Sequence, residues 1–233
     1  MVRRPAAAFL GFGAALLPAP ALACRLALLL ALDVSASVDE AEYALQRDGL
    51  AAALLAPEVQ TAFLASPHPV ALAAFEWSGR WNQQLVLDWT LVRRPEDLSR
   101  AAALVAAAER SEDEFPTAIG YALGHSARLF RQAPACDRRT LDVSGDGENN
   151  EGFSPALAYR NFKLDWVAVN ALAIGGSVQL DDLVSYFRRE VIRGPGAFVE
   201  TAVDYSDFER AMRRKLEREV GSRAIGGVAG DAR

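Results

Sequence analysis

A continuous apolar run from Leu26 to Leu32 constrains this chain more than any other stretch of its sequence. The run shows neither the helical period of about 3.6 residues nor the strict alternation of a half-exposed strand. An unbroken apolar segment of this length is typical of a strand that helices cover on both faces, as in a parallel sheet. The run therefore predicts a buried strand in an α/β domain.

Three oxygen-bearing side chains follow this strand at intervals of two residues: Asp33, Ser35 and Ser37. In an extended loop, such spacing turns the side chains to one side. Open α/β sheets bind ligands beyond the carboxyl ends of their strands, and hard oxygen atoms are the ligands of Mg²⁺ and Ca²⁺. Two other interpretations stay open, because Ser37 begins an S-x-x-E capping box for the next helix, and Asp33 and Ser35 are also common turn residues.

Strand-like and helix-like segments alternate through most of the chain. The predicted strands cover residues 26–32, 70–75, 84–89, 139–143, 166–174 and 197–201. The predicted helices cover residues 40–56, 95–110, 117–130, 154–163, 180–189 and 204–220. A turn between residues 79 and 82 predicts a hairpin that joins the second and third strands. The alternation predicts a doubly wound α/β sheet flanked by helices.

The first 23 residues have the pattern of an export signal. Arg3 and Arg4 precede an apolar segment at residues 6–17, and Ala21-Leu22-Ala23 matches an A-x-A cleavage site. The apolar segment is short and two prolines follow it, so it is poorly suited to span a bilayer. We predict a signal peptide over residues 1–23, one domain over residues 24–220, a flexible tail over residues 221–233, and a periplasmic or secreted location. The alternative is an uncleaved anchor that continues into the 26–32 run.

Cys24 and Cys136 are the only cysteines of the chain, and both follow the predicted cleavage site. Two cysteines in a small exported domain commonly form a disulfide, and each of these precedes a predicted strand. If those strands are parallel neighbours, the cysteines lie at the same end of the sheet, within disulfide reach. Lipid modification of Cys24 is the alternative.

Composition and charge exclude some classes of function. The 233 residues carry a formal net charge of −5, whereas general nucleic-acid binding depends on basic side chains that neutralise phosphates. The closing helix carries a run of basic residues: Arg210, Arg213, Arg214, Lys215 and Arg218. Glutamates are interleaved with this run, so we interpret it as a solvent-exposed helix face rather than a nucleic-acid patch.

Oxygen ligands recur at two later junctions of the predicted fold. Thr117 lies where a loop enters a helix, and Asp146 follows the 139–143 strand in a glycine-flanked turn. Together with Asp33, Ser35 and Ser37, these residues offer two carboxylates and three hydroxyls from three loops. A set without sulfur or imidazole favours Mg²⁺ over Zn²⁺ or copper. Taken singly, Thr117 is more simply a helix cap and Asp146 a turn residue.

Asp33-x-Ser35-x-Ser37, followed by Thr117 and Asp146, resembles the metal-ion-dependent adhesion site (MIDAS) of von Willebrand factor A domains. The resemblance covers residues 24–220, which is nearly the whole chain after the predicted signal. The turn at residues 144–150 is further similar to a group of exported bacterial proteins with this domain. The chain departs from the family at two places: an alanine follows Ser35 where glycine is common, and a Phe-Pro pair replaces two glycines before Thr117.

The resemblance implies a six-stranded, mostly parallel sheet in the order 3-2-1-4-5-6, with residues 84–89 as an antiparallel edge strand. It places the 26–32 strand beside the 139–143 strand, which supports a disulfide between Cys24 and Cys136.

The resemblance also implies how the site residues divide their roles. Ser35, Ser37 and sometimes Thr117 bind the metal directly, whereas Asp33 and Asp146 act mostly through bound water or by orienting ligands. An acidic side chain of a partner protein takes an open coordination position, to which the charge of the ion attracts it. We therefore expect a Mg²⁺-dependent, adhesion-type protein-binding domain that is not an enzyme, with Mn²⁺ or Ca²⁺ as alternative ions.

Other functions stay open. A metal-assisted hydrolase would use water on the same ion, with Asp146 or Glu148 as the base. A structural envelope protein would carry the site as a vestige. A sugar-binding face of Trp77, Trp81 and Trp89 is a weaker interpretation than packing within the hairpin.

Overall fold

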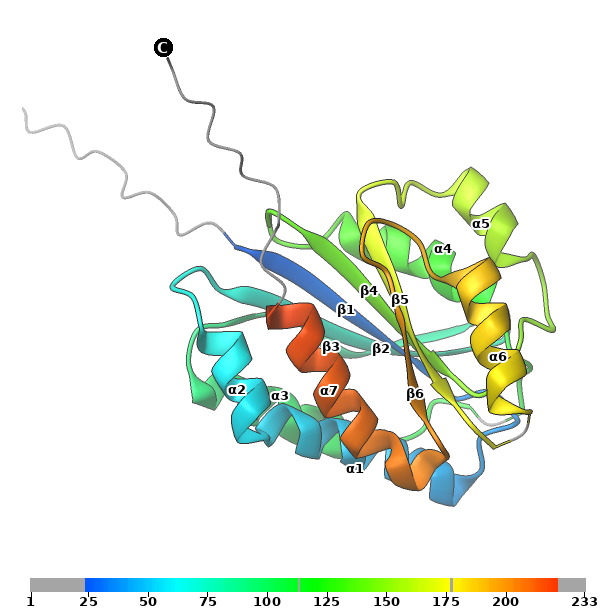
Figure 1. Ribbon diagram of the computed structural model, residues 1–233, viewed down its shortest axis with the longest axis horizontal. Helices are drawn as coiled ribbons and strands as arrows, with labels where there is room; N and C mark the ends of the chain where they lie inside the picture. Colours follow the sequence, from blue (N-terminus) through cyan, green and yellow to red (C-terminus); the bar gives the residue numbers. More distant parts are fainter. Residues whose placement is uncertain (1–23, 113, 177, 222–233) are drawn as a thin grey trace, which may run out of the picture.

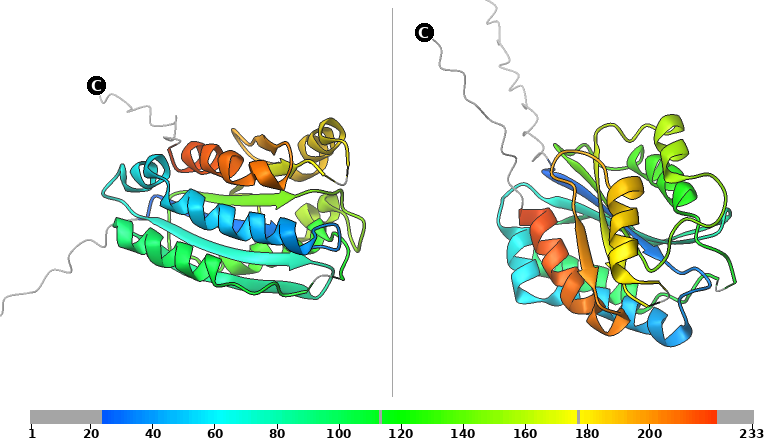
Figure 2. Two further views of the ribbon diagram at one scale, coloured as in Figure 1. Left: turned by 90° about the horizontal axis from the view of Figure 1, so that it is seen from below. Right: turned by 45° about the vertical axis from the view of Figure 1, so that its right-hand side comes forward.

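The computed structural model of the 233-residue chain describes residues 24–112, 114–176 and 178–221 (Figure 1). The predicted signal peptide lies outside these residues, and so does the predicted tail apart from its first residue, Gly221. The described residues form one sheet with helices on both of its faces (Figures 1 and 2). No helix in this part of the chain is both long enough and apolar enough to cross a membrane.

Six strands form the sheet in the order β3-β2-β1-β4-β5-β6, as the resemblance implied. The strands are β1 (Leu26–Asp33), β2 (Val70–Ser78), β3 (Asn82–Val92), β4 (Arg139–Gly145), β5 (Val167–Ile174) and β6 (Val199–Ala202). Among the described strand pairs, β2–β3 alone is antiparallel, which confirms the predicted hairpin and edge strand. The carboxyl ends of β1 and β4 therefore meet at one edge of the sheet.

The helices form two layers, one on each face of the sheet (Figure 2). One layer contains α1 (Glu40–Leu55), α2 (Pro57–Leu64), α3 (Pro95–Ala106) and α7 (Phe208–Gly221). The other layer contains α4 (Ile119–Phe130), α5 (Pro155–Asn161) and α6 (Leu180–Tyr186). A π-helical turn, η1 (Phe187–Val191), continues α6, and a 3-10 turn, η2 (Tyr205–Asp207), precedes α7.

The central strand β1 shows why the apolar run has no polar face. All of its residues are buried, and alternate side chains enter opposite hydrophobic cores. Leu28 and Leu30 pack in the core beneath α1 and α7, whereas Leu29 and Ala31 pack in the core beneath α4. Because both faces are covered, every position of the strand favours an apolar residue.

The first turns of two helices decide the capping alternatives. Asp39, and not Ser37, caps α1: its carboxylate accepts the backbone N–H of Glu42, and the Glu42 side chain accepts the backbone N–H of Asp39. The cap position of α4 is Ala118, which follows Thr117 and has no side-chain cap. The capping interpretations of Ser37 and Thr117 are therefore wrong, and both hydroxyls make other contacts.

A disulfide joins Cys24 to Cys136, with their Cα atoms 4.3 Å apart. The two residues also form a parallel bridge just ahead of β1 and β4. This confirms the predicted pairing, which follows from the neighbouring positions of the two strands. Because the disulfide occupies the sulfur of Cys24, lipid modification of this residue does not fit the structure.

The closing helix differs from the prediction at Lys215. This side chain is fully buried, although we expected it on a solvent-exposed face. Its ammonium nitrogen lies 2.8 Å from Asp142 Oδ1 on β4 and 2.6 Å from Glu219 Oε1 on the same helix. The prediction failed because the pattern of charges along a helix does not reveal an acid on the strand beneath it.

Candidate metal site

The five predicted site residues come from three loops at the carboxyl edge of the sheet. Asp33 ends β1, and Ser35 and Ser37 follow it in the loop to α1. Asp146 directly follows β4, and Thr117 lies in the loop that enters α4. Because β1 and β4 are neighbouring parallel strands, the segments that follow them start side by side.

Hydrogen bonds connect four of these side chains. Ser35 Oγ lies 3.3 Å from Ser37 Oγ and 3.1 Å from Thr117 Oγ1. Ser37 Oγ donates to Asp146 Oδ1 at 2.7 Å. Asp33 belongs to the same group through Oδ1, which accepts the backbone N–H of Ser35 at 2.9 Å. The structure thus brings all five residues into one cluster of hydroxyl and carboxylate oxygens, which we call the oxygen cluster.

Asp33 has an unusual electrostatic environment. Its side chain is 0% exposed, and Oδ2 has no hydrogen-bond partner among the described residues. Burial, and then the negative charge of nearby Asp146, raises the pKa of Asp33 to about 8. Asp146 is buried as well. A cation placed between the two carboxylates would reverse this penalty, because positive charge favours the ionised form of an acid.

The donor chemistry of the oxygen cluster fits a hard divalent cation. Mg²⁺ and Ca²⁺ bind carboxylate, hydroxyl and water oxygens, whereas zinc and copper prefer histidine and cysteine. Within the described parts of the chain, no three His, Cys, Asp or Glu side chains gather in a group that could hold a metal. The oxygen cluster does not contradict this, because hydroxyls supply three of its five donors.

Arg110 fixes the backbone of the loop after β1, a role that its sequence context does not indicate. One of its terminal nitrogens donates to the carbonyl oxygens of Val34, Ser35 and Val38, at 3.2, 3.1 and 2.6 Å. Its charge also lowers the pKa of Asp33, but less than burial raises it. Arg110 therefore holds the loop by its backbone and leaves the side-chain oxygens of the oxygen cluster to one another.

Two asparagines in the turn after β4 position Thr117. Asn150 Oδ1 accepts the backbone N–H of Thr117 at 2.9 Å, and Asn149 Oδ1 accepts that of Gly120 at 3.0 Å. The carbonyl of Thr117 in turn accepts the backbone N–H groups of Asn150 and Glu151. The Asn-Asn pair was visible in the 144–150 turn, but its partners depend on how α4 approaches that turn.

Two further residues lie near the oxygen cluster. A Cβ at Gly145 would lie 2.9 Å from Asp33 Oδ2, so β4 passes this carboxylate closely because residue 145 is glycine. Tyr205 is buried, and its hydroxyl has no hydrogen-bond partner among the described residues. Burial and the charges of Asp146 and Asp33 raise its pKa. Sequence reasoning missed Tyr205, because an aromatic residue near the closing helix suggests ordinary core packing.

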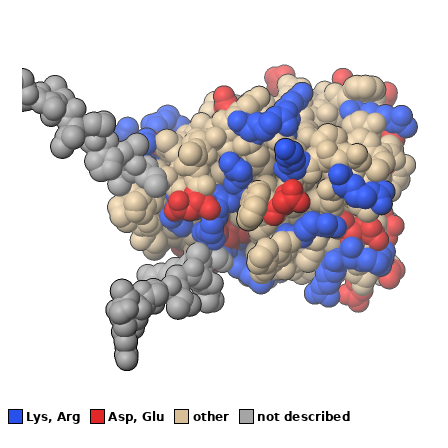
Figure 3. Space-filling view, turned by 90° about the horizontal axis from the view of Figure 1, so that it is seen from above, with Lys and Arg blue, Asp and Glu red and all other residues tan. Residues whose placement is uncertain are grey.

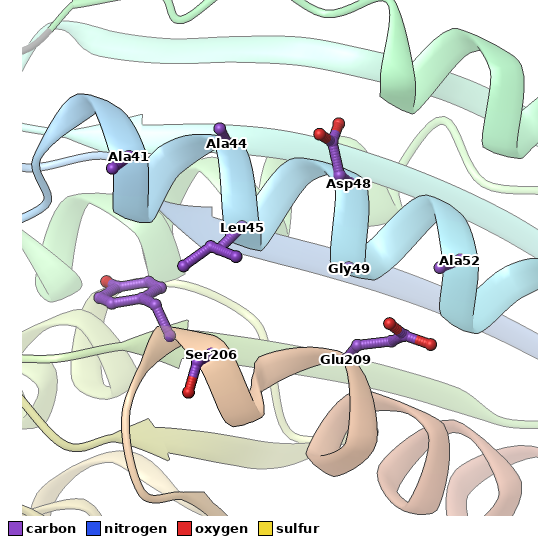
Figure 4. Close-up of a pocket in the computed structure, with 9 residues that line it drawn as sticks. Ala41, Ala44, Leu45, Asp48, Gly49, Ala52, Ser206 and Glu209 are labelled. Carbon is purple, nitrogen blue, oxygen red and sulfur yellow. The ribbon is translucent and has the colours of Figure 1, made fainter.

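A groove of about 600 Å³ lies between α1 and the segment formed by η2 and α7, and Tyr205 is part of its lining (Figure 4). Small side chains of α1 form much of its lining. Leu45 and Glu209 point into the space between the helices, whereas Asp48 points away from α7. Binding sites usually combine an apolar lining with polar groups that converge on the ligand. This groove has few such groups, so we do not assign the site to it.

The surface and the tryptophans bear on two other interpretations. Figure 3 shows basic and acidic side chains interspersed over one face of the molecule, without a continuous basic patch on that face. Trp77 is fully buried, and Trp89 packs against Phe130 with ring centroids 5.8 Å apart, whereas Trp81 is 86% exposed. The three tryptophans therefore do not share a sugar-binding face.

Comparison with known proteins identifies the family of this chain. A family profile described as "Protein of unknown function (DUF1194)" matches residues 23–224. The chain belongs to the DUF1194 family. A search of curated proteins finds no match to this DUF1194 protein.

Solved structures with a similar fold are more distant. Proximal thread matrix protein 1 from the mussel byssus is 15% identical over 86% of the DUF1194 chain and 48% of its own, with a TM-score of 0.61. Another structure of that protein, with a zinc-occupied MIDAS motif, is 14% identical over 85% and 48%, with a TM-score of 0.62.

Two bacterial structures extend the comparison. A von Willebrand factor type A protein from Catenulispora acidiphila is 16% identical over 85% of this chain and 43% of its own, with a TM-score of 0.58. The pilus adhesin SpaC from Lactobacillus rhamnosus GG is 10% identical over 84% and 31%, with a TM-score of 0.60. The DUF1194 chain spans less than half the length of each of these proteins. The likeness establishes a von Willebrand factor A-like fold.

Proposed function

We propose that this protein is an exported, metal-dependent protein-binding domain whose oxygen cluster holds Mg²⁺, with Mn²⁺ or Ca²⁺ as alternatives. The observation that carries the proposal is the carboxylate of Asp33. It is fully buried near a second buried acid, and its Oδ2 has no hydrogen-bond partner among the described residues. Its Oδ1 accepts the backbone N–H of Ser35, whose hydroxyl lies within hydrogen-bond distance of two further hydroxyls.

The residues of the oxygen cluster would have different roles in binding the ion. Ser35, Ser37 and Thr117 are suited to contact the ion directly, and Asp33 and Asp146 to balance its charge and orient its water ligands. When bound, the ion supplies positive charge and an open coordination position for an acidic side chain of a partner protein. Hydrogen bonds already link four of the five side chains, and Asp33 accepts the backbone N–H of Ser35, so little ordering is needed when the ion enters.

Two structural neighbours support metal-dependent protein binding, but neither identifies a partner for this chain. One has a MIDAS motif occupied by zinc, and another is a pilus adhesin. The disulfide between Cys24 and Cys136 is consistent with an oxidising compartment, where such bonds persist. We therefore propose a periplasmic or secreted location, in keeping with the predicted signal peptide.

We propose binding rather than catalysis. His125 stacks on Phe75 with ring centroids 4.9 Å apart, on α4 and away from its first turn, and His68 precedes β2 at the opposite edge of the sheet. Glu148 is exposed in the turn after β4. The hydrolase alternative predicts Mg²⁺-dependent cleavage of phosphate esters that disappears in Asp33→Ala, whereas our proposal predicts no such cleavage.

The test of the function is partner capture from the envelope fraction of the source cell. Immobilised wild-type protein should retain a partner in Mg²⁺ and release it when a chelator is added, whereas Asp33→Ala should retain none. Ser99→Ala, on the exposed side of α3, is the matched control and should behave as wild type. Capture that survives both the chelator and the Asp33 substitution would show that the metal has no part in binding.

A further inference from the structure

A second concave site, which we call the aromatic pocket, has a volume of about 400 Å³ and lies between the β2–β3 hairpin, α4 and the ends of α5. Its lining includes Arg80, Trp81, Tyr121, Arg128, Phe153 and Phe162. The volume falls within the range of about 300–1,000 Å³ that is typical of ligand sites. The proposed metal binding does not use any of these side chains.

Aromatic rings form the walls of the aromatic pocket. The ring centroids of Tyr121 and Phe153 lie 4.2 Å apart, and those of Phe153 and Phe162 lie 5.9 Å apart. Trp81, at the turn of the hairpin, is among the most exposed large apolar side chains of the described residues. A Cβ at Gly124 would lie 2.9 Å from the Phe162 ring, so α4 makes room for this ring. Walls of this kind favour a planar apolar group.

The rim of the aromatic pocket carries an excess of positive charge. Arg80 donates to Glu151 at 2.9 Å, and half of the Arg80 side chain remains exposed. Arg128 donates to Nδ1 of His125 at 3.0 Å. Burial and the charge of Arg128 lower the pKa of His125 to about 4, so that this ring is neutral at pH 7. The rim thus carries two guanidinium groups and one carboxylate, that of Glu151, which pairs with Arg80. Guanidinium groups bind carboxylates with two parallel hydrogen bonds.

The aromatic pocket adjoins the oxygen cluster through two backbone contacts. The N–H of Glu151, whose side chain pairs with Arg80, donates to the carbonyl of Thr117 at 3.1 Å. The N–H of Gly79, next to Arg80, donates to the carbonyl of Pro116 at 2.7 Å. The aromatic pocket and the oxygen cluster are therefore neighbours at this edge of the sheet, where Ser37 is the exposed member of the oxygen cluster.

We propose that the aromatic pocket binds an aromatic side chain with a carboxylate beside it, presented by the same protein partner that the oxygen cluster recruits. The rings enclose the aromatic group, and Arg128 and Arg80 bind the carboxylate. The identity of the partner rests on the proposed function, whereas the chemistry of the aromatic pocket does not.

The probe for this chemistry is N-acetyl-L-tryptophan, titrated calorimetrically into the full chain. We expect saturable binding that weakens at least tenfold for N-acetyl-L-tryptophanamide, because the amide lacks the carboxylate and loses the charge-assisted hydrogen bonds to the guanidinium groups. Arg128→Gln should produce a loss of similar size. Gly124→Ala should also weaken binding, because the added methyl group would push the Phe162 ring. Alanine has a higher helix propensity than glycine, so the substitution should not destabilise α4 itself. Arg131→Gln, one turn further on and outside the aromatic pocket, is the control.

Three outcomes would overturn the assignment: no binding of the acid, equal binding of acid and amide, or wild-type binding by Arg128→Gln. Binding of the probe that requires Mg²⁺ and disappears in Asp33→Ala would also overturn it, because the carboxylate would then sit on the metal. Binding of the probe that persists in Asp33→Ala would show that the aromatic pocket binds independently of the metal site. Saturating probe should reduce partner capture, and unchanged capture would refute the shared partner.

Discussion

At the scale of single residues, Asp33 decides the character of the site. It is a fully buried acid, and one of its oxygens has no hydrogen-bond partner in the part of the chain that the structure describes. Such groups cost stability unless something compensates them. Binding and catalytic sites often retain residues that the fold alone would not select. We therefore expect the oxygen cluster to lower the stability of the metal-free protein.

Asp33→Asn tests this expectation. The pKa of Asp33 is raised from 3.8 to about 8, so the folded state holds its proton more tightly than the unfolded state does. The free energy of unfolding should therefore fall as pH rises from about 4 to about 8, and this contribution is absent in the asparagine variant. In the presence of a chelator, the free energy of unfolding measured by urea denaturation should fall between pH 5 and pH 8 by about 1–3 kcal/mol more for wild type than for Asp33→Asn. Equal falls in the free energy of unfolding for the two proteins would show that the fold does not raise the pKa of Asp33.

The residues of the oxygen cluster could be predicted from the sequence, but most of their supports could not. Asp33, Ser35 and Ser37 follow a strand that the apolar run identifies, so their position at the edge of the sheet follows from local pattern. Arg110 and Tyr205 reach the oxygen cluster only through the packing of distant segments. Local patterns of charge and hydrophobicity do not predict contacts between such distant segments.

At the scale of elements, the loop between β1 and α1 depends on Arg110, which donates to three of its carbonyl groups. Arg110→Lys keeps the charge, but the lysine ammonium is more strongly hydrated and sits on a flexible stem, so it should hold the three carbonyl groups less firmly. We expect the affinity for Mg²⁺ to fall about 10–100-fold, as is common when groups behind metal ligands are changed. Calorimetric titration measures this, with the exposed Arg100→Lys as the control. An unchanged affinity would show that the loop holds its shape without Arg110.

The attachment of α7 to the sheet gives a second prediction at this scale. Lys215 is buried between Asp142 and Glu219, and its removal would leave two buried carboxylates without their cation. Lys215→Met should lower the free energy of unfolding by about 3–5 kcal/mol at pH 7. Arg210→Met removes an exposed partner of an ion pair at the start of the same helix and should cost much less than Lys215→Met. Equal effects of the two substitutions in denaturant melts would contradict the buried cluster.

At the scale of the whole molecule, the disulfide ties the starts of β1 and β4 across a sequence separation of 112 residues. Bonds that close long loops restrict the unfolded chain, and they typically stabilise a protein by about 2–4 kcal/mol. The double variant Cys24→Ser/Cys136→Ser should lose about that much in urea denaturation. A reducing agent should lower the stability of wild type, but not that of the variant. Wild type that is indifferent to the reducing agent would argue against the bond.

The sheet was predictable as a whole because its strands are covered on both faces and alternate with helices. Its order came from the family resemblance, since alternation alone does not say which strands are neighbours. β2 and β4 extend past the predicted ends to Ser78 and Gly145, because residues such as Glu76 are polar but still buried. Glu76 accepts hydrogen bonds from Tyr43 and Ser111, and sequence reasoning cannot supply those distant partners.

Calorimetric titration of Mg²⁺ into wild type and into Ser35→Ala/Ser37→Ala tests the central claim most directly. The double variant removes one buried hydroxyl, at Ser35, and one exposed hydroxyl, at Ser37, and it should remain folded because the loop backbone keeps its hydrogen bonds to Arg110. We predict one saturable site per chain in wild type and no detectable site in the variant, with Ser99→Ala equal to wild type. Absence of binding in wild type, or equal binding in wild type and the double variant, would contradict a metal site at the oxygen cluster.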